Sequence, residues 1–286
     1  MPSLRPETEP AGPGLEALYL DGTAGRLCTL LHSPAPDMPV RGALLYLHPF
    51  AEEMNKSRRM AALQARAFAR AGWWVMQQDC FGCGDSEGEF GEAAWQTWVD
   101  DAVAAATWLR QRCGFDPVLW GLRAGCLLAV AAAAHLPAGR RLLFWQPAGS
   151  GKQQLQQFLR LKVAGGMLAD GKAAGEGTRQ LREQLQSGVA VEVAGYRLAP
   201  ALAMGLDAAA LAPPATGGRV DWLEMAGGAS QDLSPAARNA IKTWEAAGWQ
   251  VGAQAVAGAS FWQTVEIEEA PLLIERTSGC LALEPA

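Results

Sequence analysis

One short stretch of the chain has the residue types and spacing of a catalytic turn. The segment Gly121-Leu122-Arg123-Ala124-Gly125 stands between two apolar runs, 117–121 and 124–136. The first run predicts a buried strand and the second a buried helix. A Gly-x-x-x-Gly turn between such elements raises its central side chain above the edge of a sheet. In acyl-transfer enzymes the central residue is a nucleophile, usually serine, whereas here it is Arg123.

A guanidinium at this position cannot attack a carbonyl carbon, because its pKa exceeds ~12 and it stays protonated. The free N–H groups of a helix N-terminus attract anions, and a fixed cation beside them makes the position a better anion site. We therefore expect Arg123 to contact a carboxylate, a phosphate or a nucleotide-sugar diphosphate, held bidentately. Alternatively, Arg123 fills the pocket in an internal ion pair with Asp232, Asp79 or Glu52.

The loop His48-Pro49-Phe50 ends the first predicted core strand. In this arrangement the loop supplies one backbone N–H for a developing oxyanion, and the residue after the central position supplies another. By position, these donors are the amides of Phe50 and Ala124. His48 completes this candidate ligand-binding set, and we expect it to shape the loop through a hydrogen bond to the backbone.

An acid and a base would have to follow later strands. Asp232, which follows the apolar run 219–226, is the candidate for the acid position; alternatively it is a solvated turn residue that helps the next helix to begin. After the last predicted strand, 249–256, a Gly-x-x-His pattern would place the base, but Phe261 stands there. The three histidines of the chain all precede residue 136: His32, His48 and His135.

The six cysteines are scattered and indicate a reduced interior. Cys80 and Cys83 form a C-x-x-C pair, but no second pair or nearby histidine completes a metal site. Their setting, the loop 79–86, reads D-x-x-G-x-G-x-S. We therefore expect no metal and no cofactor.

The elements that would position these residues are predicted to form a mostly parallel, doubly wound sheet. From residue 42 to residue 147, strand-length apolar runs alternate with helical patterns, which is typical of helices on both faces of a parallel sheet. The expected strands are 42–50, 73–79, 117–121 and 141–147, and the expected helices are 56–72, 91–112 and 124–136. A hairpin precedes them, with Asp21-Gly22 as its turn.

After residue 150 the alternation breaks. Residues 150–215 are rich in Gln, Ala and Gly with helical patches, and we interpret them as a helical lid insertion. The sheet resumes at 219–226, followed by a helix at 234–248, a strand at 249–256 and a closing helix at 270–281. The expected organisation is a flexible N-terminus (1–14), a core in two parts (15–149 and 216–286) and the lid between them.

Composition limits the partners. The chain has 286 residues, a net charge of −5 and an isoelectric point of about 5.3, with no block of Lys or Arg, which argues against nucleic acid or an anionic membrane. The longest apolar stretch, 124–136, is short of the ~20 residues that span a bilayer. The N-terminus has no apolar signal region. We expect a cytoplasmic protein.

Five segments together carry a family resemblance: GALLYLHPFAEEMNKSRR, QQDCFGCGDSEGEF, LWGLRAG, VAVEVAGYRLAPALA and FWQTVEIEEAP. They resemble the α/β-hydrolase family called exosortase A system-associated hydrolase 2, over nearly all of residues 15–281. The resemblance implies an α/β-hydrolase fold and a link to exopolysaccharide biosynthesis and to the sorting of PEP-CTERM proteins, whose components are potential partner proteins. It also implies that arginine at the turn is usual for the family, and it carries no defined substrate.

Two functions remain open. The first is a pseudo-hydrolase that binds a small anionic or acyl-bearing molecule. The alternative is an active hydrolase of an ester or thioester that uses residues outside a Ser-His-Asp triad. Ser86 and Ser260 are loop serines without a histidine partner, and Cys126 lies inside the helix. Apolar lid residues either line an acyl groove or pack the lid onto the body: Leu159, Leu161, Val163, Met167, Leu168, Leu198, Leu202 and Met204.

Overall fold

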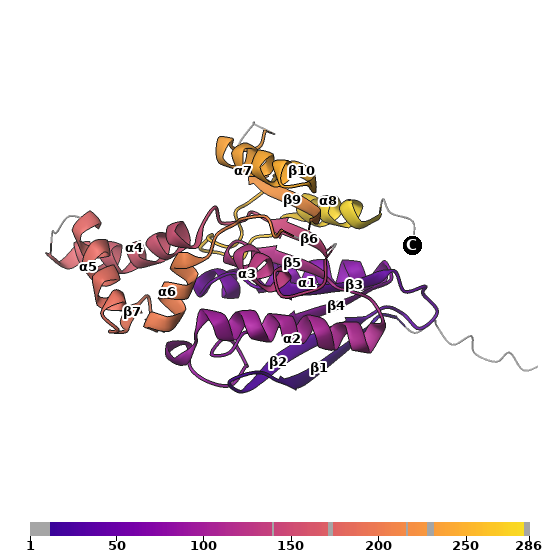
Figure 1. The fold of residues 1–286 in the computed structure, drawn as a ribbon, viewed down its shortest axis with the longest axis horizontal. Coiled ribbons are helices and arrows are strands. Elements are labelled where there is room, and N and C mark those ends of the chain that lie inside the picture. The colour runs from indigo at the N-terminus through magenta and orange to yellow at the C-terminus, as the bar shows by residue number, and fades with distance from the viewer. Residues whose placement is uncertain (1–11, 139, 171–173, 216, 228–231, 283–286) are drawn as a thin grey trace, which may run out of the picture.

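An eight-stranded sheet forms the centre of the molecule in a computed structural model, which describes all residues except 1–11, 139, 171–173, 216, 228–231 and 283–286. Its strand order is β1-β2-β4-β3-β5-β6-β9-β10 (Figure 1). β2 pairs antiparallel with β1 and β4, and the other neighbours are parallel. The strands are β1 (Gly14–Asp21), β2 (Arg26–Ser33), β3 (Gly42–Leu47), β4 (Trp73–Gln78), β5 (Val118–Leu122), β6 (Arg140–Trp145), β9 (Gly218–Ala226) and β10 (Trp249–Ala257).

Helices cover both faces of the sheet, as the alternating pattern predicts. One hydrophobic cluster joins a sheet face to α2 (Trp95–Cys113), α3 (Ala124–Ala133) and α7 (Pro235–Ala246). The other joins the opposite face to α1 (Glu52–Arg70) and α8 (Pro271–Ala282). The strands in the middle are buried on both sides, which explains why β3 and β5 read as continuous apolar runs.

The segment between β6 and β9, called the insertion below, holds three helices and a hairpin. These are α4 (Gly151–Asp170), α5 (Ala174–Gln186), β7 (Val191–Val193), β8 (Tyr196–Leu198) and α6 (Pro200–Ala208). In Figure 1 the insertion lies at the left, beyond the ends of the central strands. Our helical interpretation of 150–215 missed the hairpin, whose two-residue turn, Ala194-Gly195, has the positive φ angles of a tight hairpin turn.

The apolar residues of the insertion mostly pack it together rather than line a groove. Leu159, Leu198 and Leu202 are fully buried in the core, whereas Leu161 is 51% exposed. The side chains of Met167 and Leu168 lie outside the described residues. α1 also begins at Glu52, four residues before the predicted start, which brings an acidic first turn next to the end of β3.

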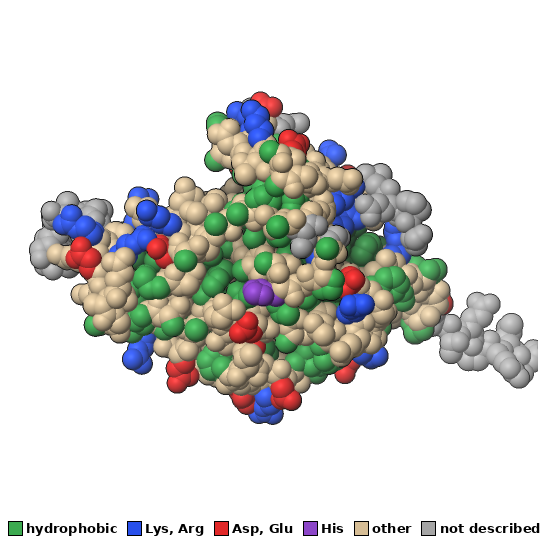
Figure 2. Space-filling model, viewed as in Figure 1, with side chains coloured by type: hydrophobic (Ala, Val, Ile, Leu, Met, Phe, Trp, Pro, Cys, Tyr) green, Lys and Arg blue, Asp and Glu red, His purple; other side chains and the backbone are tan. Residues whose placement is uncertain are grey.

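Two observations concern the surface. Acidic and basic side chains are interspersed with apolar and neutral groups on the face seen in Figure 2. Among the described residues, no helix combines the length and the apolar character that crossing a membrane requires.

Candidate functional site

Arg123 occupies the strained centre of a sharp strand-to-helix turn. It follows β5 and precedes α3, with φ 55° and ψ −117°. Both flanking glycines are required by close backbone packing: a Cβ at Gly121 would lie 2.6 Å from backbone atoms of Gly125 and Cys126, and a Cβ at Gly125 would lie 2.0 Å from the Leu47 oxygen. The turn therefore has the geometry that presents a nucleophile, although its side chain is a guanidinium.

The Arg123 side chain is held by one carboxylate, two amides and an aromatic ring. Its Nε donates to Glu53 Oε1 (3.3 Å), and its Nη2 donates to the amide oxygens of Gln154 (3.3 Å) and Gln157 (3.0 Å). The guanidinium carbon lies 5.7 Å from the centre of the Trp262 ring. The side chain is only 13% exposed, so these contacts hold it in place.

The acidic partner of Arg123 is none of the three that we considered from the sequence. Asp79 pairs with Arg58 at 2.8 Å, and Glu52 accepts a hydrogen bond from Tyr196 at 3.1 Å. Asp232 is exposed and is not part of the cavity that contains Arg123. The partner is instead Glu53, which lies in the first turn of α1 and is partly buried, whereas its neighbour Glu52 is exposed.

Glu53 is the one carboxyl that contacts Arg123 among the described residues. Its Oε1 accepts from Arg123 and its Oε2 accepts from the Gln154 amide at 3.2 Å. Burial raises the pKa of the Glu53 carboxyl, and the charge and hydrogen bonds of Arg123 and Gln154 oppose that rise without cancelling it.

Arg123 faces a cavity of about 500 Å³ between α1, α4 and the loop after β10. The cavity combines charged, amide and aromatic side chains and has the size of a small-molecule site. Its lining is Phe50, Glu52, Glu53, Lys56, Arg123, Gln146, Gln154, Gln157, Phe158, Leu161, Ser260, Trp262 and Gln263.

Phe261, at the position where we expected a base, has no group that can transfer a proton. Phe261 is fully buried and packs edge-on against Trp145 and Trp262. Ser260 and Trp262, on either side of it, line the cavity. The position at which we expected a base therefore anchors the loop in the core.

The histidines lie away from this cavity. His48 donates from Nδ1 to the Pro49 carbonyl (2.8 Å) and accepts at Nε2 from the Cys80 amide (3.1 Å), so both ring nitrogens are engaged. Burial lowers the pKa of His48, which favours the neutral ring. His32 contacts Gln77. His48 thus has the loop-shaping contacts that we expected of it.

Phe50 and Ala124 flank the cavity on the two loops that we expected to carry the oxyanion-type amides. Phe50 lines the cavity, and Ala124 is the first residue of α3. The residue after Phe50, Ala51, has φ 51° and ψ −125°, a second strained residue at the site. The pairing of these two amides with a ligand oxygen stays a prediction.

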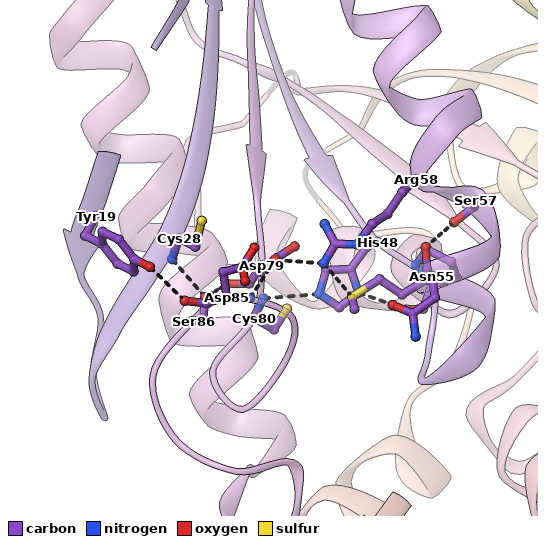
Figure 3. A network of polar contacts seen from close by, with 12 residues as sticks. Tyr19, Cys28, His48, Asn55, Ser57, Arg58, Asp79, Cys80, Asp85 and Ser86 are labelled. Atoms are coloured by element: carbon purple, nitrogen blue, oxygen red, sulfur yellow. Dashed lines mark hydrogen bonds and ion pairs between the residues drawn. The ribbon is translucent and has the colours of Figure 1, made fainter. Parts of the chain in front are cut away.

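A second polar network lies around the Asp79 loop, as Figure 3 shows. Asp79 accepts from Arg58 and from the Asp85 amide (3.2 Å), and its backbone carbonyl accepts from Ser86 (2.7 Å). Cys28, Asp79 and Asp85 place ligand atoms within 4.8 Å of one another. This spacing, which the sequence did not suggest, would suit a cation, but the guanidinium of Arg58 already neutralises Asp79.

The C-x-x-C cysteines lie in the same loop and are both free thiols. Burial raises the pKa of Cys80 and of Cys83 above the usual range of a thiol. A protonated thiol is a poor nucleophile and a poor metal ligand.

Comparison with known proteins supports the fold. A family model described as X-Pro dipeptidyl-peptidase (S15 family) matches residues 21–152, which is less than half of the chain. No curated protein matches. Similar solved structures include Est1E from Butyrivibrio proteoclasticus with bound ferulic acid (TM-score 0.62, 14% identity, covering 93% of this chain and 98% of that one).

Two further structures agree with this fold. XC6422 from Xanthomonas campestris, described as an α/β serine hydrolase without a lid, has a TM-score of 0.53 and 18% identity, covering 95% and 97% of the two chains. A carboxyl esterase from Bacillus coagulans has a TM-score of 0.60 and 11% identity, covering 94% and 97%. The fold that we expected is thereby confirmed: this chain is an α/β-hydrolase-fold protein.

Proposed function

We propose that this protein binds a small acid-bearing molecule at Arg123 and does not perform Ser-His-Asp hydrolysis. The position from which attack would come holds a permanently charged guanidinium, and the position of the base holds a buried phenylalanine. Replacing members of a triad costs on the order of 10⁴–10⁶ in rate, so the remaining arrangement would be a very weak hydrolase of that kind.

The observation that carries this proposal is the excess of hydrogen-bond donors in the cavity. The oxygens of Gln146 and Gln157 are occupied, by the Met225 amide (2.6 Å) and by Arg123 (3.0 Å) respectively. Their NH₂ groups have no partner among the described residues, and neither has Nη1 of Arg123. Both oxygens of Glu53 already accept hydrogen bonds. A ligand with acceptor oxygens, such as a carboxylate or a phosphate, would pair with these donors.

The family resemblance suggests where such binding acts. We propose a cytoplasmic protein of the exosortase A system-associated hydrolase 2 type, linked to exopolysaccharide biosynthesis and PEP-CTERM sorting. In this role the insertion would act as a lid, since α4 contributes Gln154, Gln157 and Leu161 to the cavity.

Calorimetry with matched probes tests the binding function. Benzoate and phenyl phosphate fit the aromatic walls of the cavity, and benzamide is the uncharged counterpart of benzoate. We expect the wild type to prefer benzoate to benzamide and the variant Arg123→Met to lose that preference. Arg110→Met, which removes a charge that is 56% exposed at the C-terminal end of α2, is the control and should leave binding unchanged. Equal benzoate affinity in the wild type and Arg123→Met would refute the proposal.

One observation favours the second candidate, a non-triad hydrolase. Glu53 has a raised pKa inside the cavity, which is the property of a general base. In such a reaction Glu53 would take a proton from water as the water oxygen attacks an ester or thioester carbonyl. When the tetrahedral intermediate collapses and the acyl C–O or C–S bond breaks, Glu53 would return that proton to the leaving alcohol or thiol. The developing oxyanion would lie at the amides of Phe50 and Ala124. Hydrolysis of p-nitrophenyl acetate that vanishes in Glu53→Gln but persists in Glu52→Gln would establish this candidate.

A further inference from the structure

Lys56 is a second cation in the Arg123 cavity. Its Nζ donates to the Thr264 carbonyl at 2.7 Å, which leaves two of its three N–H groups for other partners. Glu52, one turn earlier on α1, is held instead by Tyr196 and Asn55. Among the described residues, Lys56 has no acidic partner.

The loop after β10 supports both cations. Trp262 places its ring beside the Arg123 guanidinium, and the Thr264 carbonyl accepts from Lys56. Phe261 anchors this loop in the core, and the Thr264 hydroxyl bonds to the Glu266 carbonyl at 2.8 Å. The loop that would carry a catalytic histidine therefore holds two positive charges in place.

Both cations line the same cavity as Glu53. Lys56 follows Glu53 by three positions on α1, which places their Cβ atoms about 5–6 Å apart, and Glu53 contacts Arg123 directly. A small molecule with two acidic groups would therefore meet both cations within this one cavity.

We propose that the ligand carries two acidic groups, one held by Arg123 and the other by Lys56, as in a short dicarboxylate or a diphosphate. This inference rests on the proposed binding function and narrows its ligand class. The unused NH₂ groups of Gln146 and Gln157 supply further donors for the oxygens of such a ligand.

Glu53 adjusts the charge of the cavity when such a ligand binds. The groups that face it are Arg123 and Gln154, with Lys56 and Glu52 on its own helix. Its carboxyl already has a raised pKa, and an incoming anion raises that pKa further because like charges repel. A proton taken up by Glu53 on binding would leave Arg123 and Lys56 to face the two acidic groups.

The test compares probes with one and two acidic groups by calorimetry. We expect the wild type to bind glutarate at least tenfold more tightly than butyrate, or pyrophosphate at least tenfold more tightly than methyl phosphate. Whichever pair shows the difference identifies the chemistry of the ligand. Repeating the titration in buffers of different ionisation enthalpy should reveal net proton uptake with the two-acid probe.

Variants separate this inference from the proposed function. Lys56→Met should lower the affinity for the two-acid probe to that of the one-acid probe, Lys56→Arg should restore the difference, and Lys242→Met on α7 is the charge-matched control. Equal affinities for both probes in the wild type, or an equal loss in Lys242→Met, would overturn the inference. The proposed function fails separately, if Arg123→Met leaves butyrate and methyl phosphate binding unchanged.

Discussion

At Arg123 the backbone has a conformation that L-residues rarely adopt, at a cost of about 1–3 kcal/mol. Gly121 and Gly125 impose this conformation through close backbone packing. The turn presents its central side chain at the carboxyl edge of the sheet, where ligands bind in such folds. The strained backbone lowers the stability of the folded protein. Its presence therefore favours a binding role for the Arg123 side chain.

Restoring the residue types of a triad should not restore hydrolysis. In the double variant Arg123→Ser/Phe261→His, the new imidazole would replace a fully buried ring against Trp145 and Trp262, and Asp232 is not part of the cavity. We expect no p-nitrophenyl butyrate hydrolysis above background and a loss of stability on the order of 3 kcal/mol. Arg123→Ser alone is the control for both measurements, and a burst of p-nitrophenol from the double variant would contradict the prediction.

Glu53 makes stability depend on pH. Because its pKa is raised in the folded protein, the folded state binds the proton more tightly than the unfolded state does. The stability that this adds is present at low pH, below the ordinary carboxyl pKa of about 4.3, and is lost as the pH rises through the raised pKa. The Tm of the wild type, relative to Glu53→Gln, should therefore fall with rising pH. A difference that stays constant over this range would show that Glu53 does not titrate abnormally.

At the scale of elements, the packing of α3 against β3 depends on one glycine. Gly125→Ala would place a methyl group 2.0 Å from the Leu47 oxygen, so the helix would have to move. We expect a loss of at least about 3 kcal/mol in urea unfolding. Gly279→Ala on α8, where a Cβ meets nothing within 4 Å, is the matched control and should be neutral or stabilising by about 0.5–1 kcal/mol. Equal effects of the two substitutions would contradict this account.

Tyr196 links the hairpin of the insertion to α1. Its hydroxyl donates to Glu52 and accepts from Asn55, each at 3.1 Å, and burial together with Glu52 raises its pKa to about 12, so it stays protonated near neutral pH. Tyr196→Phe should speed amide hydrogen exchange in residues 191–198 while changing overall stability by about 1 kcal/mol or less. Tyr19→Phe, which removes a hydroxyl bonded to the Asp85 carbonyl, is the control and should not affect the hairpin.

At the scale of the whole molecule, the buried carboxylate of Asp221 links β6 and β9 to the C-terminal helix α8 through Arg141. Asp221 on β9 is 2% exposed and accepts from Arg141 on β6 (2.8 Å) and Arg219 (3.1 Å), and Arg141 also donates to the Cys280 carbonyl on α8. Asp221→Asn should cost about 3–5 kcal/mol, because it removes the buried charge that Arg141 and Arg219 both contact.

The control for this network is Glu183→Gln, whose carboxylate is 63% exposed and pairs with Arg179, itself 70% exposed, so it should cost about 1 kcal/mol or less. Chemical unfolding measures both variants. A loss below 1 kcal/mol for Asp221→Asn would show that the network does not hold these strands together.

The sequence alone determined the strand-turn-helix at Arg123, the alternating core and the lack of a histidine after the last strand. Each of these depends on local periodicity, glycine spacing or a count of residues, which need no knowledge of distant contacts. From the same local signals, the sequence predicted Arg123 at the centre of the turn, Phe261 at the expected position of a base, and His48 in the loop after the first core strand.

Only the tertiary structure decided which groups meet at the site. Glu53, rather than Glu52, contacts Arg123, and Glu53 and Arg123 are 70 positions apart along the chain, so only the packing of α1 against the turn brings them together. The spacing of apolar residues also could not place Lys56 and Gln146 in the cavity, since long-range packing orients them. The hairpin of the insertion, with three residues in each strand, was too short for periodicity to reveal.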